Sequence, residues 1–192
     1  MTPERRNALL RYLTRQLTAM AASTGWGPDI DWIASDRDGH LAVFATAGLG
    51  AIPARVTRDP AGLVAVMGDI ENLKGFEFKV EDFVQEPARI GAYAFDYSDE
   101  GNVGMGQYVA GHPYRRVGQT PANPLSIDSF GMDAADYLRD VCFAQLCFSE
   151  WPEIVVEDAF AETHRPTDWD QSSRPELLHP VAPRPEPPAD AP

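Results

Sequence analysis

The sequence predicts an α+β domain, in which a mainly antiparallel β-sheet packs against an N-terminal amphipathic helix and one or two further helices. Three observations support this prediction. Helical periodicity is confined to a few separated segments, strand-like alternation recurs in neighbouring runs, and short turn signals join those runs. With 192 residues and 44% hydrophobic content, the chain can bury one sizeable core. We therefore expect a single domain over residues 1–163 and a proline-rich flexible tail over residues 164–192.

The first expected element is a helix that begins at Pro3. Thr2 can cap it, proline is favoured at the first helical position, and Glu4 places an acidic group in the first turn. Apolar residues then recur on one side at helical spacing: Leu9, Leu10, Leu13, Leu17 and Met20. The arginines of this segment lie mainly on the other side, so we expect a surface helix that packs through its leucines.

A β-hairpin follows, and it is the most informative stretch of the sequence. Asp38-Gly39 is a strong signal for a two-residue turn, because both central residues of a type I′ turn need a positive φ. With this pair at the centre, Trp32 lies opposite Ala45 and Ile33 lies opposite Phe44. Both faces of the hairpin then carry apolar side chains, so we expect it to lie well inside a sheet.

Capping residues and alternation predict the later elements. Asp59-Pro60 repeats the cap-then-proline start, and Gly75 can end the helix that follows. The further expected elements are, in chain order, a strand over 76–80, a strand over 90–97 with a turn at 99–102, two or three short strands within 107–127, a helix from Asp133 towards Phe143, and a last strand over 153–156.

The chain is acidic, with a formal net charge of −13. Residues 1–28 carry +3 and the remainder carries −16. Such a body repels nucleic acid and anionic membranes and attracts a basic partner, although net charge can also serve solubility alone. No signal-peptide core follows Met1 and no run reaches the ~18 apolar residues of a membrane span, so we expect a cytoplasmic protein.

No sequence motif indicates a catalytic, metal or cofactor site. Gly48-Leu49-Gly50 lacks the third glycine of a dinucleotide fingerprint, and the histidines are dispersed. The run 36–39 only partly resembles a calcium loop and lacks its distal glutamate. Cys142 and Cys147 lie in a chain without a secretory signal, so we expect reduced structural thiols, and no histidine lies at a usual ligand spacing from them. The sequence therefore predicts no catalytic residue, no cofactor and no metal.

An interaction surface is the function that the charge supports best. Carboxylates mixed with aromatic side chains can match a basic cleft, in which aromatics act as anchors and carboxylates imitate phosphates. On this basis the expected partner-binding residues are Asp36, Asp38, Tyr93, Asp96, Tyr97, Asp99 and Glu100.

The hairpin and its exit resemble a family. The similarity lies in the spaced residues of the run from Trp32 to Pro53, in Ala-Tyr-Ala-Phe-Asp-Tyr at 92–97 and in Pro-Leu-Ser-Ile-Asp at 124–128. These segments resemble an uncharacterised bacterial family that is associated with immunity proteins of polymorphic toxin systems. The likeness covers about residues 29–160 and leaves out the arginine helix and the proline-rich tail. It implies an inhibitor that binds a toxin, and it assigns no catalytic residues.

The leading hypothesis is therefore a cytoplasmic immunity or inhibitor protein that neutralises a basic toxin domain by direct binding. Two alternatives remain open. One is a small hydrolase-like enzyme whose site forms only in the fold, with His112 near Asp96 or Glu150. The other is an adaptor that works through the tail segment 177–181. The sequence does not determine the oligomeric state.

Overall fold

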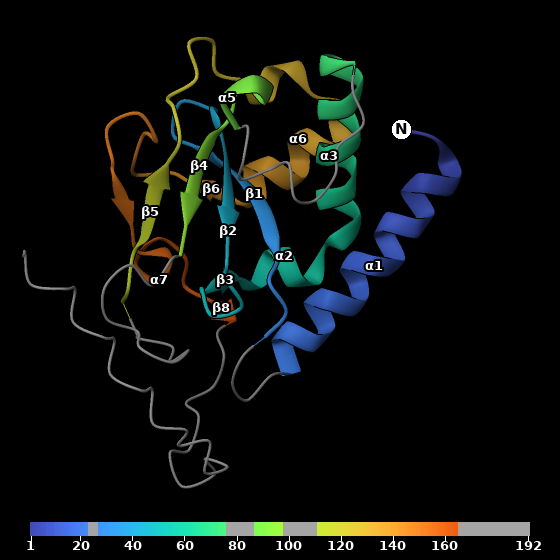
Figure 1. The fold of residues 1–192 in the computed structure, drawn as a ribbon, viewed down its shortest axis with the longest axis horizontal. Coiled ribbons are helices and arrows are strands. Elements are labelled where there is room, and N and C mark those ends of the chain that lie inside the picture. The colour runs from blue at the N-terminus through green and yellow to red at the C-terminus, as the bar shows by residue number, and fades with distance from the viewer. Residues whose placement is uncertain (23–26, 76–86, 98–110, 165–192) are drawn as a thin grey trace, which may run out of the picture.

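A computed structural model describes residues 1–22, 27–75, 87–97 and 111–164, and in it helices cover one face of a six-stranded sheet (Figure 1). The strands follow the order β6-β1-β2-β4-β5-β7. Their bounds are β1 (Asp31–Asp36), β2 (Leu41–Ala45), β4 (Tyr93–Asp96), β5 (Tyr114–Val117), β6 (Cys142–Phe143) and β7 (Glu153–Ile154). The chain is therefore α+β, as predicted.

The sheet is mixed, so the prediction of a mainly antiparallel sheet is wrong. β1 pairs with β6 and β2 pairs with β4 in parallel, whereas β1–β2, β4–β5 and β5–β7 are antiparallel. The parallel β2–β4 pair follows from the helices between these strands. Helices α2 (Ala54–Arg58) and α3 (Pro60–Lys74) lie in the connection from β2 to β4, and such a crossover lets the next strand run in the same direction.

The two faces of the sheet are buried in different ways. On one face Trp32 stacks on Phe44 with 4.4 Å between ring centroids, and Phe44 stacks on Phe95 at 5.1 Å. On the other face Ser35 donates a hydrogen bond to the Leu138 carbonyl of α6 (Met132–Asp140) at 2.7 Å. One contiguous apolar cluster includes residues from both faces, and it also takes in buried residues of α1 (Pro3–Ala22) and α3.

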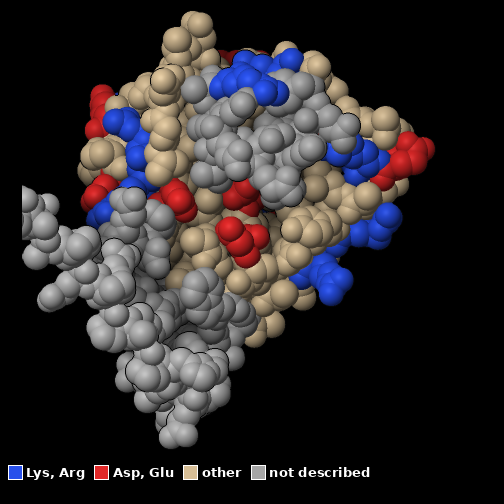
Figure 2. Space-filling model, viewed as in Figure 1, with Lys and Arg blue, Asp and Glu red and all other residues tan. Residues whose placement is uncertain are grey.

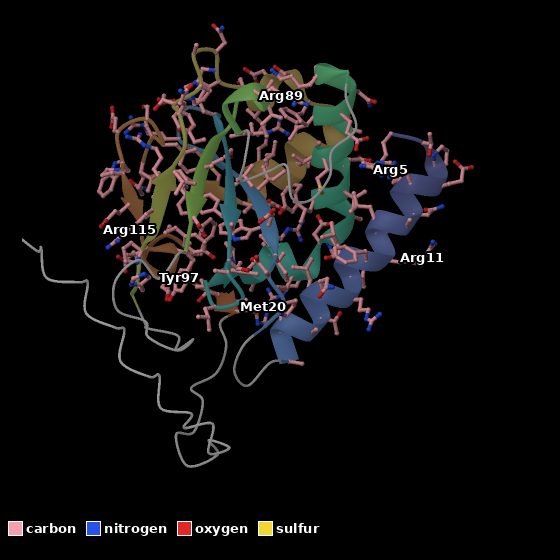
Figure 3. The ribbon with its side chains drawn as sticks, viewed as in Figure 1. Arg5, Arg11, Met20, Arg89, Tyr97 and Arg115 are labelled. Atoms are coloured by element: carbon pink, nitrogen blue, oxygen red, sulfur yellow. The ribbon has the colours of Figure 1, made fainter. Side chains whose placement is uncertain are left out.

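The predicted helix caps are confirmed. The Arg5 amide donates to the Thr2 hydroxyl, and the Gly62 amide donates to the Asp59 carboxylate at 2.9 Å. Gly75 ends α3 with a left-handed φ of 70°. Arg5 lies between α1 and α3, where it bonds Glu71 at 2.8 Å, and the labelled Arg11 points away from the fold (Figure 3).

The hairpin register differs by one residue from the prediction. Trp32 pairs with Phe44 and Ile33 with Val43, so the two large aromatics share one face. The cause is a three-residue loop at 37–39. The Asp36 amide donates to the His40 carbonyl, the Gly39 amide donates to the Asp36 carbonyl, and the Asp36 carboxylate accepts from the amides of Asp38 and His40. The prediction that both faces of the hairpin are buried is confirmed, because every residue of β2 and all but the first of β1 are buried.

Several later elements also differ from expectation. Within 90–97 the strand is shorter and follows α5 (Pro87–Ile90). In the described part of 107–127 only β5 forms a strand, and the helix from Met132 ends at Asp140. The last expected strand stops at Ile154 and gives way to α7 (Val156–Ala159), while β3 (Ile52–Pro53) pairs with β8 (Thr163–His164). The expected strand at 76–80, the turn at 99–102 and all of the tail expected at 164–192 except its first residue lie outside the described residues. That first residue, His164, belongs to β8.

Candidate protein-binding groove

A groove of about 820 Å³ lies where the two edges of the sheet approach each other. β6 and β7 stand at opposite ends of the strand order, yet both line this groove, because the sheet curls around its aromatic face. α7 and the segment 144–146 supply further walls. The groove is therefore a feature of the tertiary fold, since its walls come from segments at both edges of the sheet.

Most of the side chains that line the groove are apolar. Phe143 and Ile154 are buried at its base, and Leu146 is half-buried. Trp151 stands at the rim with 49% of its surface exposed, which is unusual for the largest apolar side chain. A concave apolar surface with an exposed tryptophan is typical of the central part of a protein-binding site.

The chain around Trp151 is held firmly by β1 and β5. The Phe148 amide donates to the buried Asp36 carboxylate at 2.8 Å. The Arg116 guanidinium donates to the Ser149 carbonyl at 2.9 Å, and the Arg116 amide donates to the Pro152 carbonyl at 2.7 Å. The backbone that carries Trp151 is thus fixed, which lowers the conformational entropy that this segment loses on binding.

Carboxylates lie on the rim of the groove. Glu153 and Asp158 are both exposed. Glu153 pairs with Arg115 at 3.1 Å, whereas Asp158 has no ion-pair partner among the residues that the structure describes. The groove therefore combines an apolar base with one unpaired negative charge at its edge.

The residues predicted to bind a partner are dispersed. Asp36 is 1% exposed, Tyr93 is 3% exposed and Tyr97 is 2% exposed, so these three side chains belong to the core. Asp38 is exposed at the hairpin turn and Asp96 is half-buried at the end of β4. The last two of the predicted residues, Asp99 and Glu100, lie outside the described residues. None of the five that are described lines the groove.

Asp38 instead forms a small cluster with Cys147 and Arg37. The Cys147 thiol donates to the Asp38 carboxylate at 2.9 Å, and Arg37 donates to the same sulfur at 2.8 Å. The hydrogen bond that the Cys147 thiol donates to Asp38 is the main reason why the pKa of Cys147 rises to about 11, and the same bond lowers the pKa of Asp38. Cys147 is accordingly a neutral thiol at physiological pH, and Cys142 is also free.

A row of charged residues crosses the sheet from β1 to the groove. The strand registers place Asp31, Asp96, Arg115 and Glu153 in line, with Ala45 between the first two. Burial, followed by the negative charges of Asp29 and Asp96, raises the pKa of Asp31 to about 7. Acidic and basic side chains are interspersed over the face in Figure 2, which shows no continuous acidic surface among the described residues there.

Sequence reasoning missed the groove because its walls come from segments far apart in the chain. Trp151-Pro152 was the one available signal, since a tryptophan next to a proline, outside any alternating run, fits no core element.

The described residues contain no group of three histidine, cysteine or carboxylate side chains that could hold a metal ion. Among the described helices, none combines the length and apolar character that crossing a bilayer requires.

The fold and the groove define an α+β protein with an apolar concavity beside an exposed tryptophan. No family model matches the chain, and neither a curated protein nor a solved structure is similar to it.

Proposed function

We propose that this chain is an immunity-type inhibitor, which neutralises a protein toxin by direct binding and takes part in no reaction of its own. The groove beside Trp151 is the observation that carries this proposal. Tryptophan is the residue most enriched among side chains that dominate binding energy, and apolar concave surfaces of this size are suited to a partner's side chains.

Charge supports a basic partner. The net charge of −13 attracts a basic protein at long range and speeds its association, and the rim carboxylates Glu153 and Asp158 lie beside the apolar contact surface. In this arrangement Trp151 contributes most of the binding affinity, while the acidic groups increase the association rate and contribute specificity. The family resemblance around the hairpin is consistent with the same role.

Recovery of a partner by the tagged full-length chain from the producing cells tests this proposal, with washes at low and then high salt. We expect one stoichiometric basic protein that stops growth when expressed alone and no longer does so when this chain is co-expressed. A toxin whose effect persists in the presence of the chain, or no partner at either salt, contradicts the proposal.

Charge reversal tests the electrostatic part. Asp158→Lys at the rim should slow association by about threefold to tenfold and weaken its dependence on salt. The control is Asp136→Lys, on the exposed side of α6, where the carboxylate pairs only with Arg139 among the described residues. Equal effects of the two variants would show that the groove rim does not face the partner.

A further inference from the structure

The outer edge of β7 forms part of the groove wall. We propose that the partner inserts an extended segment into the groove, pairs this segment with β7 through the backbone of Glu153, and places a basic side chain beside Asp158. The inference rests on the proposed function and deepens it, because it states how the partner of the inhibitor binds.

The ladder between β5 and β7 shows which backbone groups point into the groove. The Arg116 amide donates to the Pro152 carbonyl at 2.7 Å, and Tyr114 pairs with Ile154. Hydrogen-bonding direction alternates along an antiparallel pair, so Glu153, between these two positions, directs its N–H and C=O away from β5. β7 ends the strand order, and no described residue pairs with its outer edge (Figure 1). Glu153 therefore presents the donor and the acceptor that a further strand needs.

Side-chain contacts coincide with this backbone edge. Trp151, Ile154 and Val155 line the groove on either side of Glu153. In strand addition, main-chain hydrogen bonds give affinity and the pockets for alternate side chains give specificity. An apolar side chain of the added segment can contact buried Ile154 at the base and exposed Trp151 at the rim. A helix satisfies its own backbone groups, so it would leave the Glu153 edge unpaired.

The opposite wall of the groove serves for packing. β6 has only two residues, and the Leu146 amide donates to the Phe143 carbonyl at 3.2 Å, so the chain turns back directly after this strand. Phe143 and Leu146 supply apolar contacts in the groove. We therefore assign the main-chain pairing to β7 and the side-chain packing to β6.

Charge favours a basic segment of another protein over a second copy of this chain. Two copies that paired symmetrically through β7 would place Glu153 opposite Glu153, and like charges directly opposite each other are destabilising. Asp158 of α7 lines the groove and has no ion-pair partner among the described residues. A lysine or arginine in the inserted segment can pair with it. The occupant is therefore an extended segment that combines apolar and basic side chains.

Glu153→Pro tests the main-chain pairing. Proline removes the N–H that points into the groove and leaves the bonds to β5, which Pro152 and Ile154 make. Prolines occur in edge strands in this orientation, and urea denaturation checks that the fold is kept. The matched control is Glu153→Gln, because both variants remove the ion pair with Arg115 but glutamine keeps the N–H. Glu153→Pro should raise the Kd of the recovered partner by about tenfold or more, and Glu153→Gln by less than about threefold.

A second experiment uses the unchanged chain and no toxin. Random linear peptides of about 12 residues, displayed on phage, are selected on the full-length protein, and clones that bind Trp151→Ala equally well are discarded. A selected peptide is then synthesised with a single backbone N-methyl group at each position in turn. Methylation of the residue that pairs with Glu153 should raise the Kd by about tenfold, whereas methylation of either neighbour should change it by less than about twofold.

The selected peptides also test the charge contact. They should carry a lysine or arginine, and Asp158→Ala should weaken their binding by about threefold or more. Selected peptides without a basic residue, or equal binding to Asp158→Ala, would contradict the contact with Asp158.

The outcomes separate this proposal from the inhibitor function. A toxin that binds Glu153→Pro and Glu153→Gln equally would overturn the strand pairing and leave the inhibitor function intact. Peptides that tolerate N-methylation at every position, or a selection that yields no clone dependent on Trp151, would also overturn the pairing. Peptides with the expected sensitive position, together with the recovery of no toxin, would support the pairing and contradict the inhibitor function alone.

Discussion

Asp36 should be the most sensitive single carboxylate in the described part of the fold. Its side chain is 1% exposed and accepts three backbone hydrogen bonds, from Asp38 at 3.0 Å, from His40 at 2.8 Å and from Phe148 at 2.8 Å. The first two close the hairpin loop, and the third fastens the segment that leads to Trp151. Asp36→Ala removes the acceptors of all three hydrogen bonds at once.

The magnitude follows from the surroundings of each donor. The amides of Asp38 and His40 lie at the turn, where water can replace the carboxylate, so each lost bond costs about 1 kcal/mol. Phe148 is fully buried, so its amide stays unpaired and costs about 2–3 kcal/mol. Asp36→Ala should therefore lower the free energy of unfolding by about 4–5 kcal/mol. Asp36→Asn keeps one oxygen and should lose about 2 kcal/mol.

Urea denaturation at neutral pH measures this effect, with the m-value checked for a change in the unfolded state. The control is Asp136→Ala, whose exposed i,i+3 pair with Arg139 should contribute less than about 0.5 kcal/mol. If Asp36→Ala cost no more than this control, the carboxylate would not organise the hairpin loop, and the reasoning would be wrong.

Three further predictions concern stability and reactivity. Gly50→Ala should destabilise the fold by about 1–3 kcal/mol in urea denaturation, because the added Cβ would overlap the Tyr114 ring. Gly68→Ala should stabilise the fold by about 0.5–1 kcal/mol in the same experiment, because in α3 the added Cβ meets only ordinary van der Waals contacts. The pKa of Asp31 is raised to about 7, so its protonation favours the folded state and this contribution is lost as pH rises from about 4 to 7. The stability of Asp31→Asn relative to the unchanged chain should therefore grow by up to about 3 kcal/mol between pH 5 and pH 8, and a constant difference would contradict the raised pKa. With its pKa raised to about 11, Cys147 should react with iodoacetamide at pH 8 about a hundredfold more slowly than an unfolded cysteine, as followed by mass spectrometry, and an ordinary rate would show that its hydrogen bond is absent.

Local chemistry predicted the elements whose ends it controls. Thr2, Asp59 and Gly75 mark helix ends through their own hydrogen bonds or backbone conformation, and these ends are where the sequence places them. The hairpin was located correctly, but its register was not. Asp38-Gly39 favours a two-residue turn, and the buried Asp36 carboxylate stabilises a three-residue loop instead.

Features that depend on distant parts of the chain could not be predicted in the same way. The two-residue strand β6 is too short to show alternation, and only its partner β1 defines it. Tyr93 and Tyr97 were expected to act as surface anchors because they stand beside carboxylates, but in the fold their rings are buried. Trp151 is exposed at the rim of a groove that forms only when the sheet curls.

The binding of the identified partner to Trp151→Ala tests the central claim most directly. The matched control is Tyr12→Ala on α1, since Tyr12 is 45% exposed, close to the 49% of Trp151, and does not line the groove. Removal of a tryptophan that dominates an interface should raise the Kd by about 30-fold or more, whereas Tyr12→Ala should change it by less than about twofold. Equal Kd values for Trp151→Ala and the unchanged chain would show that the groove is not where the partner binds.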